Sequence, residues 1–294
     1  MRLSDNIGNT PLIKISDKVY AKAELFNPTG SIKDRPASYI INDAEKRGVL
    51  KRGDTIIEAT SGNMGVSFAW LAAERGYRCV IVMPSNMSEE RKKTMVYYGA
   101  ELIEVPAGEF DTAIELRDRL SRENGWFNCN QFDNPINILS HEETTAKEIL
   151  KDVGYGGDNY MVVDAFVTGT GTGGTLMGAG VKVKESIPMT KIIAIEPDES
   201  PVMSGGKPGL HGIQGIGDGS KFLVNMDVVD EVIRVKTEEA KERSLRLSSE
   251  MGIFVGISAG ANILASERWV EKNSPSGIVV TFLCDRGDRY FSCL

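Results

Sequence analysis

Apolar runs of strand length alternate with amphipathic stretches of helical length along most of the chain. Several of these runs are almost continuous in valine and isoleucine, which is typical of parallel strands covered on both faces. We expect strands at 19–25, 55–59, 79–83, 101–105, 161–167, 191–196, 231–235 and 278–284. The amphipathic stretches predict helices at 37–47, 65–76, 88–99, 110–124, 144–154, 237–252 and 258–273.

Strands that alternate with helices form βαβ units, which build open parallel sheets with helices on their faces. A Gly-Gly-Asp sequence at 156–158 separates two groups of such units. We therefore expect an α/β fold with an N-terminal domain of residues 1–150 and a C-terminal domain of residues 151–294. Ligands of open α/β sheets bind beyond the carboxyl ends of the strands, so the segments directly after the strands are candidates for the functional site.

Composition and charge exclude several classes of function. The 294 residues include 34 basic and 41 acidic side chains, a formal net charge of −7, which argues against nucleic acid or an anionic membrane as partner. The four cysteines are widely spaced and form no CxxC pair, which favours a reduced, cytoplasmic protein. With two histidines, the chain has few parts for a histidine-based zinc site, and we expect no metal site.

The first segment suited to chemistry is NPTGSIKDRP, residues 27–36. Pro36 predicts a helix that begins near Lys33, so this lysine lies at the positive end of the helix. That position, with Arg35 beside it, disfavours the protonated amine and makes Lys33 a candidate for Schiff-base formation. On its own, the segment is more typical of a solvated surface lysine after a turn.

The second and third segments each follow a predicted strand. TSGNMG (60–65) combines short polar donors with the start of a helix, which suits a carboxylate but also an ordinary capped turn. TGTGTGGT (168–175) holds four glycines, which let backbone N–H groups approach a phosphate closely. The same glycines match the G-x-G-x-x-G pattern, and Glu196 ends the next strand. A nicotinamide-dependent oxidoreductase is therefore the alternative from another class.

The fourth segment is CDRGDRY, which begins at Cys284 at the end of a predicted strand. A thiol at this place can reach a bound ring, although such a cysteine is more often an inert buried side chain. Glycine is unevenly distributed, because 13 of the 31 glycines lie within residues 169–219. We expect the second part of that stretch, residues 204–219, to border the same pocket as the loop at 168–175.

In combination these motifs resemble the cysteine synthase (O-acetylserine sulfhydrylase) family, and CDRGDRY is more similar to its B-type members. The resemblance runs in order from Asn6 to Ser292 and also includes QFDNPINILSHEETTAKEI, IQGIG and VGISAGAN. It implies fold type II of the enzymes that use pyridoxal 5′-phosphate (PLP), similar to the tryptophan synthase β chain, with two open, twisted, mostly parallel sheets flanked by helices. Residues of about 40–145 would form a mobile smaller part, and the first strands would join the other sheet.

The resemblance also implies roles for individual residues. Lys33 would hold PLP as the internal aldimine and act as general base at the substrate Cα. The cofactor would be bound by Asn63 at its 3′-oxygen, by Ser258 at the ring edge, and at its phosphate by Gly171, Thr172, Gly173, Gly174 and Thr175. The substrate carboxylate would be bound by Thr60, Ser61, Asn63 and Gln131. Cys284 would lie near the pyridine nitrogen, and the sequence leaves Asp285 open as the alternative.

The implied function is a PLP-dependent β-replacement that forms L-cysteine from O-acetyl-L-serine and sulfide through an α-aminoacrylate. Other β-replacements of the same fold stay open, including those that use O-phosphoserine, form cystathionine or form a diaminopropionate. A basic side chain near the leaving group would favour O-phosphoserine, and Lys207 and Lys221 are the candidates. The sulfur donor stays open between sulfide, thiosulfate and a carrier protein. The resemblance also implies a homodimer.

Overall fold

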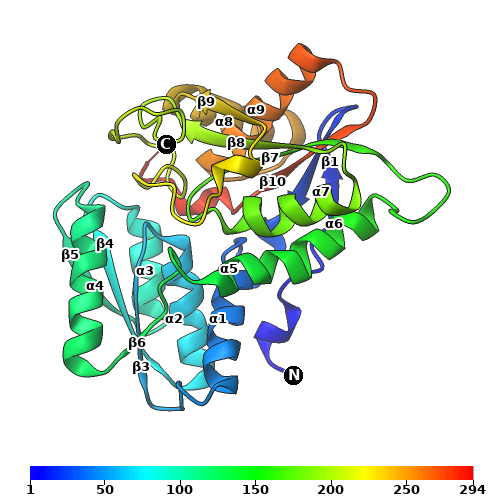
Figure 1. The fold of residues 1–294 in the computed structure, drawn as a ribbon. Coiled ribbons are helices and arrows are strands. Elements are labelled where there is room, and N and C mark those ends of the chain that lie inside the picture. Colours follow the sequence, from blue (N-terminus) through cyan, green and yellow to red (C-terminus); the bar gives the residue numbers. More distant parts are fainter. Residues whose placement is uncertain (294) are drawn as a thin grey trace.

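The computed structural model describes residues 1–293 and contains two separate β-sheets, shown in Figure 1. The larger sheet has six strands in the order β1-β2-β10-β7-β8-β9, and the smaller has four in the order β5-β4-β3-β6. Helices flank both sheets. The α/β fold with two mostly parallel sheets, predicted from the sequence, is therefore confirmed.

The larger sheet joins the start of the chain to its second half. Its strands are β1 (Leu12–Lys14), β2 (Val19–Ala23), β7 (Val163–Gly169), β8 (Lys191–Pro197), β9 (Glu231–Val235) and β10 (Ile278–Leu283). β1 runs antiparallel to β2, whereas all the other neighbours are parallel. Because β2 pairs with β10, an N-terminal strand lies beside the last strand of the chain.

The smaller sheet is entirely parallel and is formed by the segment between these two parts. Its strands are β3 (Thr55–Ala59), β4 (Arg78–Pro84), β5 (Glu101–Val105) and β6 (Phe127–Asn128). Every residue of β3 is buried, and its sequence, TIIEA, is apolar except for Thr55 and Glu58. The one charged residue in β3, Glu58, forms an ion pair with Arg117 at 3.1 Å.

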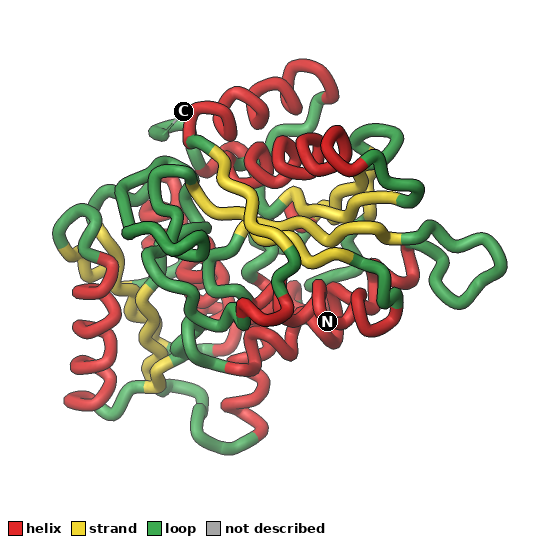
Figure 2. Tube along the Cα trace, turned by 45° about the horizontal axis from the view of Figure 1, so that its top comes forward, coloured by secondary structure: helices red, strands yellow, loops and turns green. Residues whose placement is uncertain are grey.

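Helices cover both faces of each sheet, as Figures 1 and 2 show. On the smaller sheet, α4 (Phe110–Asn124) covers one face, and α2 (Asn63–Arg75) and α3 (Glu89–Tyr97) cover the other. On the larger sheet, α8 (Thr237–Met251) and α9 (Ile257–Asn273) lie on one face, and α6 (Lys147–Asp152) and α7 (Val181–Ser186) on the other. Two further helices, α1 (Asp34–Lys46) and α5 (Pro135–Ser140), pack against each other where the two parts meet.

Two stretches of π-helix depart from the elements that the sequence pattern predicts. The predicted helix at 144–154 instead begins with a π-helical turn at His141–Ala146 that continues into α6, and a second π-helical turn at Leu176–Gly180 leads into α7. These two turns pack against each other. A Cβ atom on Gly178 would collide with the carbonyl oxygen of Ile138, so glycine allows this close contact.

A buried ionic cluster anchors the start of α1. Arg35 is fully buried, and its guanidinium forms ion pairs at 2.7 Å with Glu24 and with Glu148 of α6. Burial acts to raise the pKa of Glu148, but the hydrogen bonds and charge of Arg35 outweigh it and lower the pKa to about 2. Lys22 of β2 adds a further pair with Glu148 at 3.1 Å. The residues around Lys33 are therefore held by groups from three separate elements.

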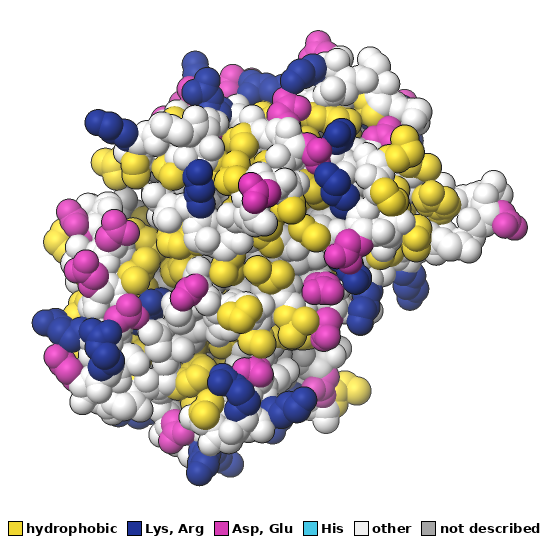
Figure 3. Space-filling model, viewed as in Figure 1, with side chains coloured by type: hydrophobic (Ala, Val, Ile, Leu, Met, Phe, Trp, Pro, Cys, Tyr) yellow, Lys and Arg dark blue, Asp and Glu magenta, His cyan; other side chains and the backbone are white. Residues whose placement is uncertain are grey.

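Basic and acidic side chains are interspersed over the face of the molecule shown in Figure 3. They form no broad basic area on this face of the kind that binds nucleic acids. Within residues 1–293, no helix combines the length and the apolar character needed to cross a membrane.

Candidate active site

Lys33 precedes the first residue of α1, where segments from both sheets line a pocket. The helix begins at Asp34, in agreement with the start predicted from Pro36. The loop before the helix is tied to the end of β10, because the Ile32 N–H donates to the carbonyl oxygen of Cys284 at 2.9 Å. Among the described residues, Lys33 Nζ has no hydrogen-bond or ion-pair partner, so its amine is free to react.

The electrostatic surroundings of Lys33 make the amine a better nucleophile than a surface lysine. Burial lowers the pKa of Lys33, while nearby Cys284, Asp218 and Asp285 oppose that shift. Only the neutral amine can attack a carbonyl carbon or accept a proton. A lowered pKa is therefore the condition that covalent and general-base roles of a lysine require.

The loop after β3 presents Thr60, Ser61 and Asn63 to the same pocket. Between them, Gly62 has a φ of +150°, and a Cβ atom there would collide with the guanidinium of Arg91. The Gly62 N–H donates to Thr60 Oγ1 at 3.0 Å, which stabilises the turn. Glycine is thus required for this path of the loop, which places short polar side chains at the start of α2.

Gln131 follows β6 and is held by the buried end of β3. Its backbone N–H donates to Glu58 Oε2 at 3.0 Å, and its side-chain Nε2 donates to the carbonyl oxygen of Ala59, also at 3.0 Å. Because Glu58 is fixed by its ion pair with Arg117, the amide of Gln131 is pre-positioned beside the loop that contains Ser61.

The glycine-rich loop after β7 forms the opposite wall. Gly173 has a φ of +88°, and a Cβ atom on Gly171 would collide with the carbonyl oxygen of Gly215. Within residues 1–293, the backbone N–H groups of Gly171, Thr172 and Gly173 donate to no acceptor. Unpaired N–H groups in a glycine loop that enters a helix form an anion site, so this loop suits a phosphate.

Two residues from distant segments brace the glycine loop. Asn137 of α5 donates from Nδ2 to Thr172 Oγ1 and to the carbonyl oxygen of Gln131, both at 3.0 Å. His141 Nε2 lies 3.3 Å from Thr175 Oγ1, while its Nδ1 lies 2.9 Å from Thr145 Oγ1. These contacts connect the glycine loop with the segment that carries Gln131.

His141 is held in its neutral form. Burial, with smaller contributions from the charges of Arg35 and Lys33, lowers its pKa well below the usual 6.5. A neutral imidazole can donate from one ring nitrogen and accept at the other. It can therefore orient the hydroxyl of Thr175 without adding a charge next to the loop.

At the end of β10, Cys284 lines the pocket and Asp285 does not. Cys284 Sγ accepts a hydrogen bond from Asn262 Nδ2 at 3.3 Å. Burial, followed by the charge of Asp285, raises the pKa of Cys284 to about 12, so the side chain is a neutral thiol. The carboxylate of Asp285 instead accepts hydrogen bonds from Asn63 and Tyr290.

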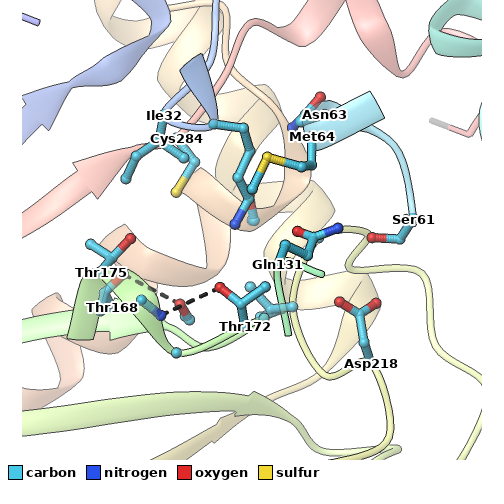
Figure 4. A pocket seen from close by; sticks show the side chains of 18 of the residues that line it. Ile32, Ser61, Asn63, Met64, Gln131, Thr168, Thr172, Thr175, Asp218 and Cys284 are labelled. Atoms are coloured by element: carbon cyan, nitrogen blue, oxygen red, sulfur yellow. Dashed lines mark hydrogen bonds between the residues drawn. The ribbon is translucent and has the colours of Figure 1, made fainter. Parts of the chain in front are cut away.

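Figure 4 shows how these side chains surround one cavity. Cys284 and Asn63 lie on one side of it, Thr172 and Thr175 lie on the opposite side, and Ser61 and Asp218 lie near one end. The wall includes every residue that the sequence analysis singled out as a site residue: Lys33, Thr60, Ser61, Asn63, Gln131, Gly171, Thr172, Gly173, Gly174, Thr175, Ser258 and Cys284. Their individual roles stay predictions.

The wall also contains residues that the sequence analysis did not select. Gln214, Gly215, Ile216 and Asp218 come from the stretch 204–219, which was expected to border the pocket because of its glycine content. Of these residues, Asp218 matters most for the chemistry of the site, and the sequence analysis did not select it. A carboxylate between two glycines, in GIGDG, was the available signal.

The nicotinamide alternative depends on Glu196, and the structure uses this residue differently. Its carboxylate accepts hydrogen bonds from the backbone N–H groups of Met203 at 2.6 Å and Ser204 at 3.1 Å. It does not line the pocket that holds the glycine loop. Glu196 thus holds the chain that follows β8 and does not act as the acidic partner of the dinucleotide pattern.

The combination of donors fits PLP. The free amine of Lys33 can bind an aldehyde, and the unpaired N–H groups of Gly171, Thr172 and Gly173 can bind the phosphate. Asn63 lines the same pocket and keeps one N–H on Nδ2 beyond the bond to Asp285. Such a set of groups lies in one pocket only because both sheets contribute to it.

Comparison with known proteins decides the family. Residues 3–285 match the model of the family described as "Pyridoxal-phosphate dependent enzyme". The chain belongs to this family. It is therefore a PLP-dependent enzyme, and the resemblance found in the sequence is confirmed.

The relatives of this PLP-dependent enzyme carry more than one activity in their names. A cysteine synthase of Staphylococcus aureus is 43% identical over 97% of this chain and 94% of its own length. An O-ureido-L-serine synthase of Streptomyces lavendulae is 40% identical over 98% of this chain and 90% of its own. A hydrogen sulfide-producing enzyme of Fusobacterium nucleatum has a solved structure with a TM-score of 0.92 and 38% identity, covering 98% of this chain and 99% of its own.

Proposed function

We propose that the protein forms L-cysteine from O-acetyl-L-serine and sulfide, with release of acetate. The observation that carries this proposal is the unpaired amine of Lys33, which shares one pocket with the polar loop at Ser61 and with the glycine loop at Gly171. Lys33 then has an amino-acid site on one side and a phosphate site on the other. The name of the Staphylococcus aureus relative supports cysteine as the product.

The cofactor would be held by groups that the fold has already oriented. Lys33 would bind PLP covalently, the glycine loop from Gly171 to Thr175 would bind its phosphate, and Asn63 would hydrogen-bond its 3′-oxygen. Ser258 would lie at the ring edge. When bound, PLP supplies an electron sink that stabilises negative charge at the substrate Cα.

The substrate would be oriented by the loop after β3. The hydroxyls of Thr60 and Ser61, the amide of Asn63 and the amide of Gln131 would bind its carboxylate, in the way that short donors at a helix start bind anions. After the substrate amine has displaced it, Lys33 would remove the proton from Cα and return it at the end of the cycle. Loss of acetate precedes the addition of sulfide, so we expect ping-pong kinetics.

Cys284 would lie at the pyridine nitrogen, as a neutral thiol. A carboxylate at this place would hold a proton on the nitrogen, whereas a thiol with a pKa of about 12 does not. The smaller part of the molecule would close over the reacting centre to exclude water. The loop at Ser61 is the expected trigger, because it would bind the carboxylate.

The test is turnover by the purified enzyme loaded with PLP. We expect acetate release and L-cysteine formation from O-acetyl-L-serine and sulfide, at a kcat/KM well above that for O-phospho-L-serine. O-ureido-L-serine and homocysteine, offered as alternative substrate and nucleophile, would identify another β-replacement. If sulfide and O-acetyl-L-serine together yield no cysteine, the proposal is wrong.

We further propose that the enzyme is a homodimer, as the family resemblance implies. The chain has a mass of 32.1 kDa, so light scattering on the purified enzyme should give a mass of twice that value. A mass of one chain at micromolar concentration would contradict the proposal.

A further inference from the structure

Asp218 lies where the inner pocket meets the outside of the molecule. It lines the pocket around Lys33 and also an outer cleft formed by residues that include Asp111, Leu210 and His211. Ser61, Gln214 and Asp218 are the three residues common to both. A leaving group or a nucleophile that passes between the outer cleft and Lys33 therefore passes the carboxylate of Asp218.

The position of this carboxylate is defined from several sides. Asp218 Oδ2 lies 3.6 Å from the place of a Cβ atom on Gly171, so it faces the glycine loop. Burial raises the pKa of Asp218 above its usual value, and His211, Lys33, the Ser61 hydroxyl and Arg91 offset part of that rise by favouring the ionised form. In the working enzyme, the positive charge of the Lys33 amine would be altered by its bond to the cofactor, which leaves less positive charge to offset Asp218.

Apart from Lys33, no lysine or arginine among the described residues lines either cavity. The charged residues that line the inner pocket are Lys33 and Asp218, and neither lysine nor arginine lines the outer cleft. Lys207 and Lys221, the candidates for a basic side chain near the leaving group, are exposed and line neither cavity. Arg91 lines neither cavity, although its guanidinium donates to Ser88 and Gln214 and its charge favours the ionised form of Asp218.

We propose that Asp218 is a specificity-determining residue that disfavours doubly charged leaving groups and nucleophiles on the path between the outer cleft and Lys33. On the leaving-group side it would disfavour O-phospho-L-serine, and on the nucleophile side it would disfavour thiosulfate relative to sulfide. Acetyl esters and the singly charged hydrosulfide ion would be admitted. This inference rests on the proposed function, because it assigns substrate classes to the same site.

The physical reason is the scaling of Coulomb energy with charge. Repulsion by a fixed carboxylate is twice as large for a dianion as for a monoanion at the same place. A variant that removes the charge and raises kcat/KM for hydrosulfide by about threefold should therefore raise it for thiosulfate by the square of that factor, about tenfold.

The first experiment compares the two sulfur donors in the holoenzyme. Asp218→Asn, which keeps the shape of the side chain, should raise kcat/KM for thiosulfate by about tenfold and for sulfide by no more than about threefold. Asp111→Asn is the matched control, because it removes the same charge from the outer cleft alone. A thiosulfate-to-sulfide ratio that stays the same in Asp218→Asn overturns the inference, and so does an equal gain in Asp111→Asn.

A second experiment needs no turnover. Calorimetric titration of the holoenzyme with L-2-amino-4-phosphonobutanoate and with L-methionine compares a doubly charged and a neutral side chain of similar length. Asp218→Asn should improve the affinity for the phosphonate by about tenfold relative to methionine. An unchanged ratio of the two affinities overturns the inference about Asp218. If the ratio changes as expected but the enzyme makes no cysteine, the inference is supported and only the proposed function is refuted.

Discussion

Asn63 at the start of α2 donates a hydrogen bond from Nδ2 to Oδ2 of Asp285, which follows β10, at 2.5 Å. The two residues are 222 positions apart and come from segments that follow strands of different sheets. On the other side, Asn63 Oδ1 accepts from Arg289 at 2.7 Å. The carboxylate of Asp285 therefore orients a side chain of the pocket wall, while its neighbour Cys284 forms the wall itself.

We predict that Asp285→Asn weakens PLP binding by about fivefold, because a hydrogen bond to a charged acceptor is worth about 1 kcal/mol more than one to a neutral acceptor. The measurement is an absorbance titration of the apoenzyme with PLP. Asp288→Asn is the control, because Asp288 pairs with Arg286 at the surface, and its PLP affinity should be unchanged. Equal affinities in the wild type and Asp285→Asn would show that Asn63 is oriented without this carboxylate.

We predict a pH-dependent stability that originates in His141. Its pKa is lowered well below 6.5 in the folded protein by burial, so the unfolded chain binds a proton that the folded chain does not. The neutral state of His141 therefore contributes to the free energy of unfolding in full above about pH 7, and this contribution is lost as the pH falls through about 6.5. The loss reaches up to about 2 kcal/mol at pH 5.

The measurement is urea unfolding of the wild type and of His141→Gln at pH 7 and pH 5. Glutamine stays neutral, so the stability of the variant should fall less between the two pH values than that of the wild type. The comparison uses the difference between pH values, so any constant cost of the substitution cancels. Parallel changes in both proteins would mean that His141 titrates normally in the fold.

We predict that Cys284→Ser retains most of the activity, within about threefold in kcat, because a hydroxyl can replace a neutral thiol as a partner of Asn262 and Ser258. Cys284→Asp should lower kcat by at least about tenfold, because a carboxylate would change the charge of the pyridine nitrogen. Steady-state assays and the cofactor absorbance spectrum measure both effects. A Cys284→Ser variant as impaired as Cys284→Asp would assign the thiol a role in the chemistry itself.

The sequence pattern predicted three of the strands with their observed bounds. The strands at 55–59, 101–105 and 231–235 have the predicted bounds, because short β-branched runs between polar turns leave little freedom in where a strand starts or ends. β1 and β6 were missed, since three and two residues carry no periodicity. The π-helical turn at Leu176–Gly180 was also missed, because its glycines serve contacts with another segment rather than helix formation.

The parts of the candidate site that local sequence motifs form were predictable from the sequence. The parts that depend on tertiary contacts were not. Lys33 and the loops after β3 and β7 follow from glycine, proline and the strand ends. The bracing of Thr172 by Asn137 depends on how α5 packs, which no local pattern encodes. Which of Cys284 and Asp285 lines the pocket likewise needed the structure, because adjacent residues at a strand end point in different directions.

The most direct test of the central claim is to locate the bond between PLP and the protein. The purified enzyme should be yellow, and borohydride should bleach it and fix the cofactor to the chain. Mass spectrometry of the digested protein should then find the reduced phosphopyridoxyl group on Lys33, and Lys33→Ala, supplied with PLP, should carry none. A protein that stays colourless after PLP has been added, or a modification on another lysine, would contradict the account.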